Sequence, residues 1–108
     1  MKRYSVNITG EALADMESLY NYIAYTLKSP DNAMRQYNRL ADAIMTLDEF
    51  PERYGIFNSE PEYSLGIRRM TVDNFLVCYV VDDYSVTVIA VLYGASDVHT
   101  RLINRSTS

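Results

Sequence analysis

The chain has 108 residues, of which nearly half are apolar and one is a cysteine, and its formal net charge is -4. This composition excludes a disordered chain, and the single cysteine excludes an intrachain disulfide framework or a cysteine-based zinc site. The longest apolar runs fall far short of the roughly 20 residues of a membrane helix. We therefore expect one cytoplasmic domain over residues 1–108, with a frayed tail from about residue 97.

The first half of the chain predicts a strand followed by two helices. Polar and apolar residues alternate over residues 4–9, as in a half-buried strand. Apolar residues recur at three- and four-residue steps over residues 11–28 and again from Pro30 to the stop at Pro51, which predicts two amphipathic helices. Ser29 is the expected cap of the second helix, and Pro30 suits its first position. The expected buried faces are Leu13, Met16, Tyr20, Ile23 and Leu27 in the first helix, and Ala33, Tyr37, Leu40, Ala41, Ile44 and Leu47 in the second.

The second half predicts an ordered loop and three strands. Residues 51–64 contain two prolines and a glycine and show no periodicity, which favours a surface loop. Strands are expected over residues 65–72, 75–81 and 85–93, with tight turns between them and a buried Cys78 thiol in the central run. The element order β-α-α-β-β-β predicts an α+β two-layer fold. A helical hairpin would pack on one face of a mainly antiparallel four-stranded sheet and leave the other face free for function.

An ordered set of motifs runs through nearly the whole chain. It comprises Tyr4-Ser-Val-Asn-Ile-Thr9 before a helix with Ala12, the helix exit Leu47…Pro51…Gly55, the run Gly66-Ile-Arg68-Arg69-Met70, Phe75–Tyr79, and Val91–Asp97. This set resembles the RelE/ParE superfamily of bacterial type II toxins. The resemblance implies a small cytoplasmic toxin that a cognate antitoxin wraps and blocks, either in a hetero-oligomer with the antitoxin or as a homodimer. Some members cleave messenger RNA in the ribosomal A site, and others poison DNA gyrase.

Metal-free RNA cleavage requires a base, an acid and cations that stabilise the crowded phosphorane. Arginine suits the cationic role because its guanidinium binds phosphate oxygens bidentately. Neighbouring strand residues point to opposite faces, so Arg68 and Arg69 cannot both line one site. The family pattern assigns the phosphate-facing role to Arg68, for which a solvated or salt-bridged sheet arginine is the alternative. We expect Arg69 to pair with an acid such as Glu11 or Glu17.

Four further residues complete the candidate catalytic set: Tyr93, His99, Arg53 and Arg101. RNA-cleaving relatives often carry histidine where Tyr93 stands, arginine where Ser96 stands and lysines near Arg53, so the resemblance supports the family better than the reaction. A tyrosine with an ordinary pKa near 10 is a poor base at neutral pH, and structural packing is the alternative role for Tyr93. His99 could equally be an exposed tail residue. No motif predicts a cofactor or a metal ion.

Three functions follow as hypotheses. The first is a ribosome-dependent endoribonuclease, the second is a gyrase poison that acts by binding alone, and the third is a degenerate module that retains antitoxin binding. The negative net charge favours the gyrase poison over the endoribonuclease. The arginines in the second half of the chain are grouped, however, and could form a local positive surface. The series Tyr20, Tyr22 and Tyr25 indicates a helix face that packs in or beside the core, and rings that stay half-exposed on it are available to a partner as the alternative.

Overall fold

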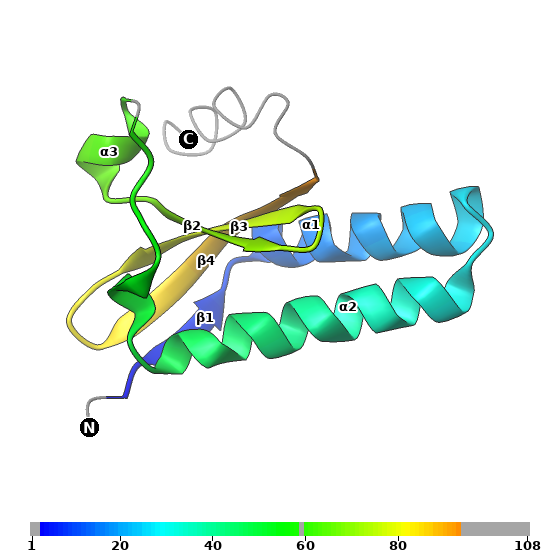
Figure 1. Cartoon of the computed structure of the whole chain (residues 1–108), viewed down its shortest axis with the longest axis horizontal. Coiled ribbons are helices and arrows are strands. Elements are labelled where there is room, and N and C mark those ends of the chain that lie inside the picture. The colour runs from blue at the N-terminus through cyan, green and yellow to red at the C-terminus, as the bar shows by residue number, and fades with distance from the viewer. Residues whose placement is uncertain (1–2, 59, 94–108) are drawn as a thin grey trace.

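The computed structural model describes residues 3–58 and 60–93. A four-stranded sheet has the order β1-β4-β3-β2 and packs against two long helices (Figure 1). β1 pairs with β4 in parallel, and the other two pairings are antiparallel. The predicted α+β fold is therefore confirmed, and β1 is an edge strand. The elements are β1 (Ser5–Ile8), α1 (Gly10–Asn21), a π-helix η1 (Tyr22–Thr26), α2 (Pro30–Met45), the 3-10 turns η2 (Thr46–Asp48) and η3 (Pro51–Arg53), α3 (Glu62–Leu65), β2 (Arg68–Val72), β3 (Phe75–Val81) and β4 (Ser85–Tyr93).

The predicted strand over residues 65–72 begins three residues too early. Leu65 belongs to the short helix α3, which ends where Gly66 adopts a left-handed conformation with φ 71°. Glycine takes this conformation without the steric cost that a side chain would add, so the chain can turn from α3 into β2. The turns at Asp73-Asn74 and Asp82-Asp83 lie where the sequence predicts them.

The two long helices form a hairpin that extends beyond the sheet (Figure 1). Thr9 caps α1, because its hydroxyl oxygen accepts the backbone N–H of Ala12 at 3.1 Å. The predicted side-chain cap by Ser29 is wrong: Ser29 occupies the cap position of α2, but its side chain makes no capping hydrogen bond. Within the described residues, no helix is long and apolar enough to cross a membrane.

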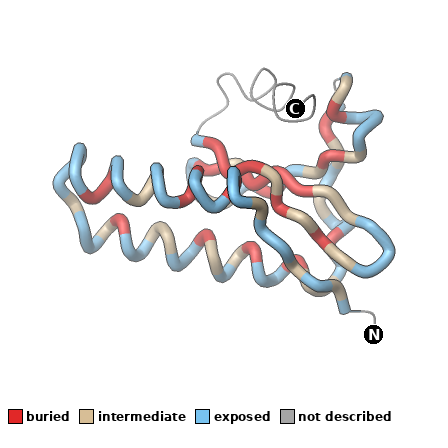
Figure 2. The backbone as a smooth tube through the Cα atoms, turned by 180° about the vertical axis from the view of Figure 1, so that it is seen from behind, coloured by how far each residue is buried: buried red, intermediate tan, exposed pale blue. Residues whose placement is uncertain are grey.

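The main core lies between the helices and the sheet, and buried positions recur along the inner sides of both helices (Figure 2). The predicted face of the second helix is confirmed, with Leu40 and Ile44 of α2 and Leu47 of η2 at or near zero exposure. The predicted face of the first helix is partly wrong, because Leu13 and Leu27 are 42% and 55% exposed. The switch from α1 to the π-helix adds a residue to the turn, so Leu27 no longer follows the α-helical stripe.

The opposite face of the sheet is not left open as the sequence suggests. Phe57 and Ile67, which flank α3, pack with Cys78, Ala90 and Leu92 in a second buried cluster. The predicted burial of Cys78 is confirmed.

A buried carboxylate joins α1 to the sheet where β1 ends. Asp15 is 8% exposed, and its Oδ2 accepts the backbone N–H of Val91 at 2.9 Å. β1 pairs with β4 as far as Val88, so the Asp15 carboxylate supplies an acceptor that the neighbouring strand no longer provides.

Replacing Asp15 tests this contact. We expect Asp15→Ala to lower the free energy of unfolding by about 2 kcal/mol, because it leaves the buried Val91 N–H without this acceptor. Asp15→Asn keeps a carbonyl oxygen at the same place and is expected to cost less. Urea unfolding of the three proteins measures the difference, and an Asp15→Ala variant within 0.5 kcal/mol of the wild type would contradict the assignment.

Candidate functional site

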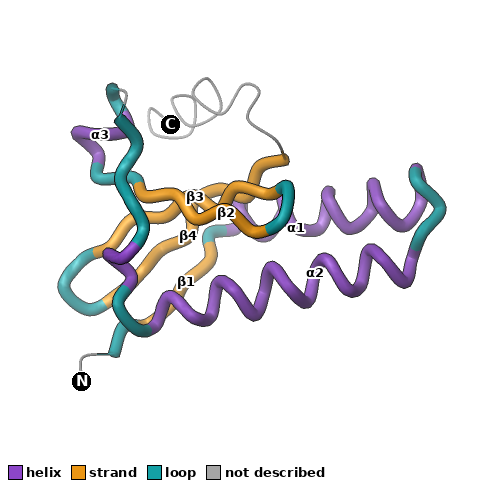
Figure 3. The backbone as a smooth tube through the Cα atoms, viewed as in Figure 1, coloured by secondary structure: helices purple, strands orange, loops and turns teal. Residues whose placement is uncertain are grey.

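Two of the predicted site residues meet at the segment Thr46–Tyr54, which we call the clamped loop. This loop leads from α2 toward α3 and β2 and lies across one end of the sheet (Figure 3). It contains η2 and η3, and its apolar residues Leu47 and Pro51 are buried. At the β1 end of the sheet, the Tyr4 N–H donates to the Asp48 carbonyl at 2.9 Å, and Arg3 forms an ion pair with Asp48 at 2.6 Å.

Arg53 folds back onto the loop that carries it. Its Nη1 donates to the backbone carbonyls of Glu49 and Phe50 at 2.6 and 3.1 Å, and its Nη2 donates to the Thr46 hydroxyl at 3.1 Å. The guanidinium carbon lies 4.8 Å from the centre of the Tyr54 ring. The planar fork of an arginine can satisfy several carbonyls at once, so Arg53 fixes the curvature of the loop.

Arg68 reaches the same loop from β2. Its Nη1 donates to the carbonyls of Tyr54 and Glu52 at 2.6 and 3.2 Å, and its Nη2 lies 3.5 Å from the Glu52 carboxylate. The Arg68 side chain is 17% exposed. These donors are the ones that would hold a phosphate, so a phosphate on Arg68 would have to displace the carbonyls of the loop.

Tyr79 of β3 is the third residue whose side chain holds the clamped loop. Its hydroxyl donates to the Pro51 carbonyl at 2.6 Å, and the residue is fully buried. Burial raises the pKa of this hydroxyl from 10.0 to about 12, against the opposing effect of the nearby Arg68 and Arg53 charges. Tyr79 was not a predicted site residue. Strand alternation places it on the same face as Met70 and Val77, but a sequence cannot show that its hydroxyl reaches a loop 28 positions earlier.

Tyr93, the other predicted site residue that the structure describes, is not joined to this cluster. Arg68 is paired with Tyr79, whereas Tyr93 is paired with Phe75, the first residue of β3. Those two positions are four residue steps apart along β3, a separation of about 13 Å. Tyr93 is 60% exposed, and its ring centre lies 5.7 Å from that of Phe75. His99 and Arg101 lie outside the described residues, so the catalytic set stays a prediction.

Arg69 lies on the opposite face of the sheet from Arg68, as strand alternation predicts. Its guanidinium carbon lies 5.2 Å from the centre of the Phe57 ring. The expected ion pair with Glu11 or Glu17 is not among the ion pairs of the described part of the chain. Arg69 therefore packs on the second cluster instead of reaching the helices.

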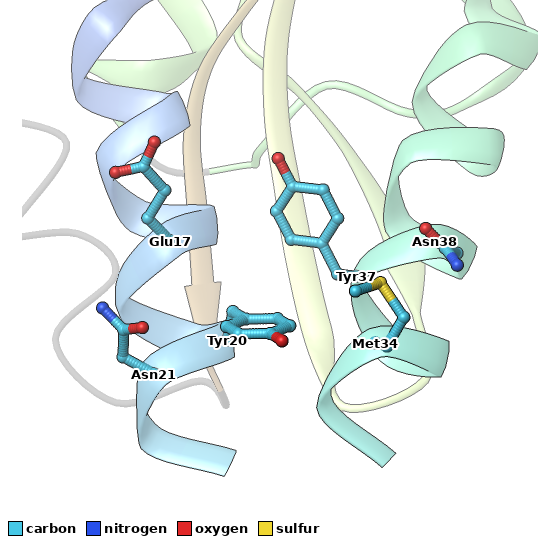
Figure 4. Close-up of a pocket in the computed structure, with 6 residues that line it drawn as sticks. All are labelled: Glu17, Tyr20, Asn21, Met34, Tyr37 and Asn38. Carbon is cyan, nitrogen blue, oxygen red and sulfur yellow. The ribbon is translucent and has the colours of Figure 1, made fainter. Parts of the chain in front are cut away.

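A separate hollow of about 400 Å³ opens between α1 and α2 near the free end of the hairpin (Figure 4). Tyr20 and Tyr37 line it from the two helices, and their rings meet edge to face with centres 6.1 Å apart. Met34 of α2 and Glu17 of α1 also line it (Figure 4). No cluster of three metal-ligating side chains gathers here or elsewhere in residues 3–58 and 60–93.

The chain matches one family model over most of its length. The model is described as the ParE toxin of the type II toxin-antitoxin system parDE, and the match covers residues 6–98. No curated protein matches the chain in sequence.

Solved structures share the fold. A chain of the chromosomal ParDE system from P. aeruginosa is 18% identical with a TM-score of 0.72, and the match covers 88% of this chain and 100% of that one. A chain of the toxin-antitoxin complex RelBE2 from Mycobacterium tuberculosis is 21% identical with a TM-score of 0.60, covering 89% and 97%. The YoeB dimer from Staphylococcus aureus gives 16% identity and a TM-score of 0.56, covering 86% and 99%. At these identities, the likeness establishes the fold alone.

The raised pKa of Tyr79 predicts a pH-dependent contribution to stability. The neutral hydroxyl makes the hydrogen bond, so its contribution is complete below pH 10 and is lost as the pH rises from 10 to about 12. We expect Tyr79→Phe to lower the free energy of unfolding by about 1–2 kcal/mol at pH 7. Urea unfolding of both proteins should show this difference shrinking between pH 10 and 12. A difference that is constant with pH would contradict the role of the hydroxyl.

Arg53→Lys tests whether the fork or the charge of Arg53 fixes the clamped loop. Lysine keeps the charge but cannot reach both sides of the loop as the fork does, so we expect a loss of about 1 kcal/mol in unfolding free energy. Amide exchange in the clamped loop should become faster. Unchanged exchange and stability would show that charge alone suffices.

Proposed function

The chain belongs to the ParE toxin family of type II toxin-antitoxin systems, and on this premise we propose that it arrests growth by binding and inhibiting DNA gyrase. It acts in the cytoplasm without cleaving RNA, and a cognate antitoxin neutralises it. The observation that carries this proposal is the engagement of Arg53 and Arg68 with backbone carbonyls of the clamped loop. Two guanidinium groups that hold the fold together are poorly placed to hold a phosphorane as well.

Two further facts support a binding mode of action. Tyr93 and Arg68 pair with β3 residues that lie four positions apart, so an acid and a cation would not meet across one scissile phosphate. The chain also carries a net charge of -4, which opposes close approach to ribosomal RNA. A surface that inhibits by occupying a protein partner needs neither a proton donor nor a positive groove.

We propose that the antitoxin binds to the helical hairpin. The hairpin extends past the sheet, so no second layer from residues 3–58 or 60–93 covers η1 and the start of α2 (Figure 1). Tyr22, Tyr25 and Leu27 are each more than half exposed there, close in sequence to residues that line the hollow between the helices. An antitoxin segment with apolar side chains would supply the missing layer.

Parallel assays on purified toxin test the target. We expect the wild-type chain to inhibit gyrase supercoiling of a relaxed plasmid and to leave messenger RNA intact in ribosome toeprinting. Tyr93→Phe should arrest growth as the wild type does, because no proton transfer depends on its hydroxyl. Cleavage in the ribosomal A site that falls a hundredfold or more in Tyr93→Phe would overturn the proposal and favour the endoribonuclease. Induced expression of the chain should arrest growth, and coexpression of the cognate antitoxin should restore it. This control establishes that the chain is an active toxin.

A further inference from the structure

The hollow of about 400 Å³ between α1 and α2 is lined from matching positions on the two helices. Each helix contributes a tyrosine, the asparagine that follows it, and the residue three positions before the tyrosine. Residues three and four positions apart share one side of a helix, so the three side chains of each helix lie together. The residues are Glu17, Tyr20 and Asn21 of α1, and Met34, Tyr37 and Asn38 of α2. The two helices therefore differ most at one position, where α1 carries a carboxylate and α2 carries a thioether.

Glu17 and Met34 lie toward opposite ends of this hollow. The two helices run in opposite directions, and the rings of Tyr20 and Tyr37 meet between them. One turn before Tyr20 places Glu17 toward the sheet, whereas one turn before Tyr37 places Met34 toward the free end of the hairpin (Figure 4). The hollow thus has an acidic end and an apolar end, with two aromatic rings between them.

The polar groups that line the hollow are not used by the fold. Glu17, which the sequence suggests as a partner for Arg69, takes part in none of the ion pairs or hydrogen bonds found among residues 3–58 and 60–93. The two tyrosine hydroxyls and the two asparagine amides are free of such contacts in the same part of the chain. Lys28 and Arg35 are exposed on the hairpin, but neither lines the hollow. Glu17 is therefore the one charged group among the described lining residues, and its charge is not neutralised there.

This combination of groups favours a cationic ligand. A carboxylate and the faces of two tyrosine rings attract a positive charge, and the hydroxyl and amide oxygens can accept its hydrogen bonds. Arginine fits better than lysine, because its planar guanidinium can stack on a ring while its N–H groups reach a carboxylate. An anionic ligand would meet the Glu17 carboxylate with no lining cation to offset it. A purely apolar side chain would bury that carboxylate without a partner.

We propose that an arginine side chain of the antitoxin occupies this hollow, with its guanidinium against the Tyr20 and Tyr37 rings and paired with Glu17. The inference rests on the proposed function in taking the antitoxin as the partner that binds the hairpin. The net charge of -4 favours such a basic segment over a second copy of this chain.

The two ends of the hollow also orient the bound segment. Met34 is 49% exposed at the apolar end, and the exposed rings of Tyr22 and Tyr25 follow on η1 toward the free end of the hairpin. The arginine therefore lies on the side of the sheet, and the apolar side chains of the same antitoxin segment lie toward the free end. The guanidinium fixes the register of a segment that apolar contacts alone would allow to slide.

Glu17→Gln tests the ion pair in the full-length toxin with its purified cognate antitoxin. Glutamine has a similar shape and helix propensity, so the change removes the charge and leaves the helix intact. We expect antitoxin binding to weaken about tenfold in Glu17→Gln, mainly through faster dissociation, and to weaken further in Glu17→Lys. Asp83→Asn is the matched control, because it removes an exposed acid from the β3–β4 turn, far from the hairpin (Figure 1). Asp83→Asn should bind as the wild type does, and all three variants should keep the wild-type thermal midpoint.

The antitoxin arginine is identified by a double-mutant cycle. Each arginine and lysine of the antitoxin is replaced singly by glutamine and measured against the wild-type toxin and against Glu17→Gln. One arginine should lose most of its effect on binding when the Glu17 charge is absent, which independent sites would not show. Coupling of Glu17 to no antitoxin cation would overturn the inference. Coupling to a lysine alone would overturn the assignment of a guanidinium.

Tyr25→Ala separates this inference from the proposed function. Tyr25 is 73% exposed on the hairpin and does not line the hollow. Antitoxin binding that falls in Tyr25→Ala but ignores Glu17→Gln keeps the hairpin as the antitoxin surface and overturns the arginine. Binding that ignores both variants overturns both proposals. Binding that needs Glu17, by a toxin that leaves gyrase untouched, contradicts the gyrase target and supports this inference.

Two further readouts assign the hollow to a different occupant. A molecular mass of the isolated toxin that depends on Glu17 would place a second copy of the chain in the hollow. Gyrase inhibition that falls in Glu17→Gln while antitoxin binding is unchanged would place the target there. Either result overturns the inference.

Discussion

The hydrogen bonds that Arg53, Arg68 and Tyr79 make to the clamped loop are the constraint on which the rest of the structure depends. The loop crosses one end of the sheet and contacts it at both sides. Its Asp48 carbonyl accepts from Tyr4 beside β1, and its later carbonyls accept from side chains on β2 and β3. The helical layer is thereby fastened to both halves of the sheet. Without these anchors, the passage from α2 to β2 would be a loop whose many polar backbone groups depend on water.

These hydrogen bonds give Arg53 and Arg68 a structural role in place of the phosphate-binding role that the family suggests. From chemistry alone, a guanidinium near a sheet surface in this family suggests phosphate binding, and the sequence leaves a solvated or salt-bridged sheet arginine as the alternative for Arg68. The structure provides the competing ligands: carbonyl oxygens from a loop 14 to 16 residues earlier in the chain. A toxin that acts by occupying a protein surface is consistent with such a use of charge, because binding requires a stable shape more than a free cation.

Most of the fold could be predicted from the sequence because local patterns determine it. The period of the apolar residues distinguishes helices from strands, and Pro30 marks the start of α2. The run from Phe75 to Val81 is apolar at successive positions, on both faces of a strand, which indicates a central strand. What could not be predicted depends on contacts between distant segments. Leu27 is exposed because a π-helix alters the turn, the second face of the sheet is covered by Phe57 and Ile67, and Phe50 is fixed by side chains up to 29 residues away in the chain. Periodicity contains none of this information.

The bond between Asp15 and Val91 has a consequence for how the molecule behaves in a crowded solution. β1 pairs with β4 only as far as Val88, so β1 does not pair the rest of this edge of β4. An open edge of apolar strand is a template on which another chain can add and begin to aggregate. Asp15 occupies a donor of that edge with a carboxylate, so a strand that added there would have to displace a charge and bury it. The same contact that joins α1 to the sheet therefore opposes the addition of another strand to the valine-rich β4.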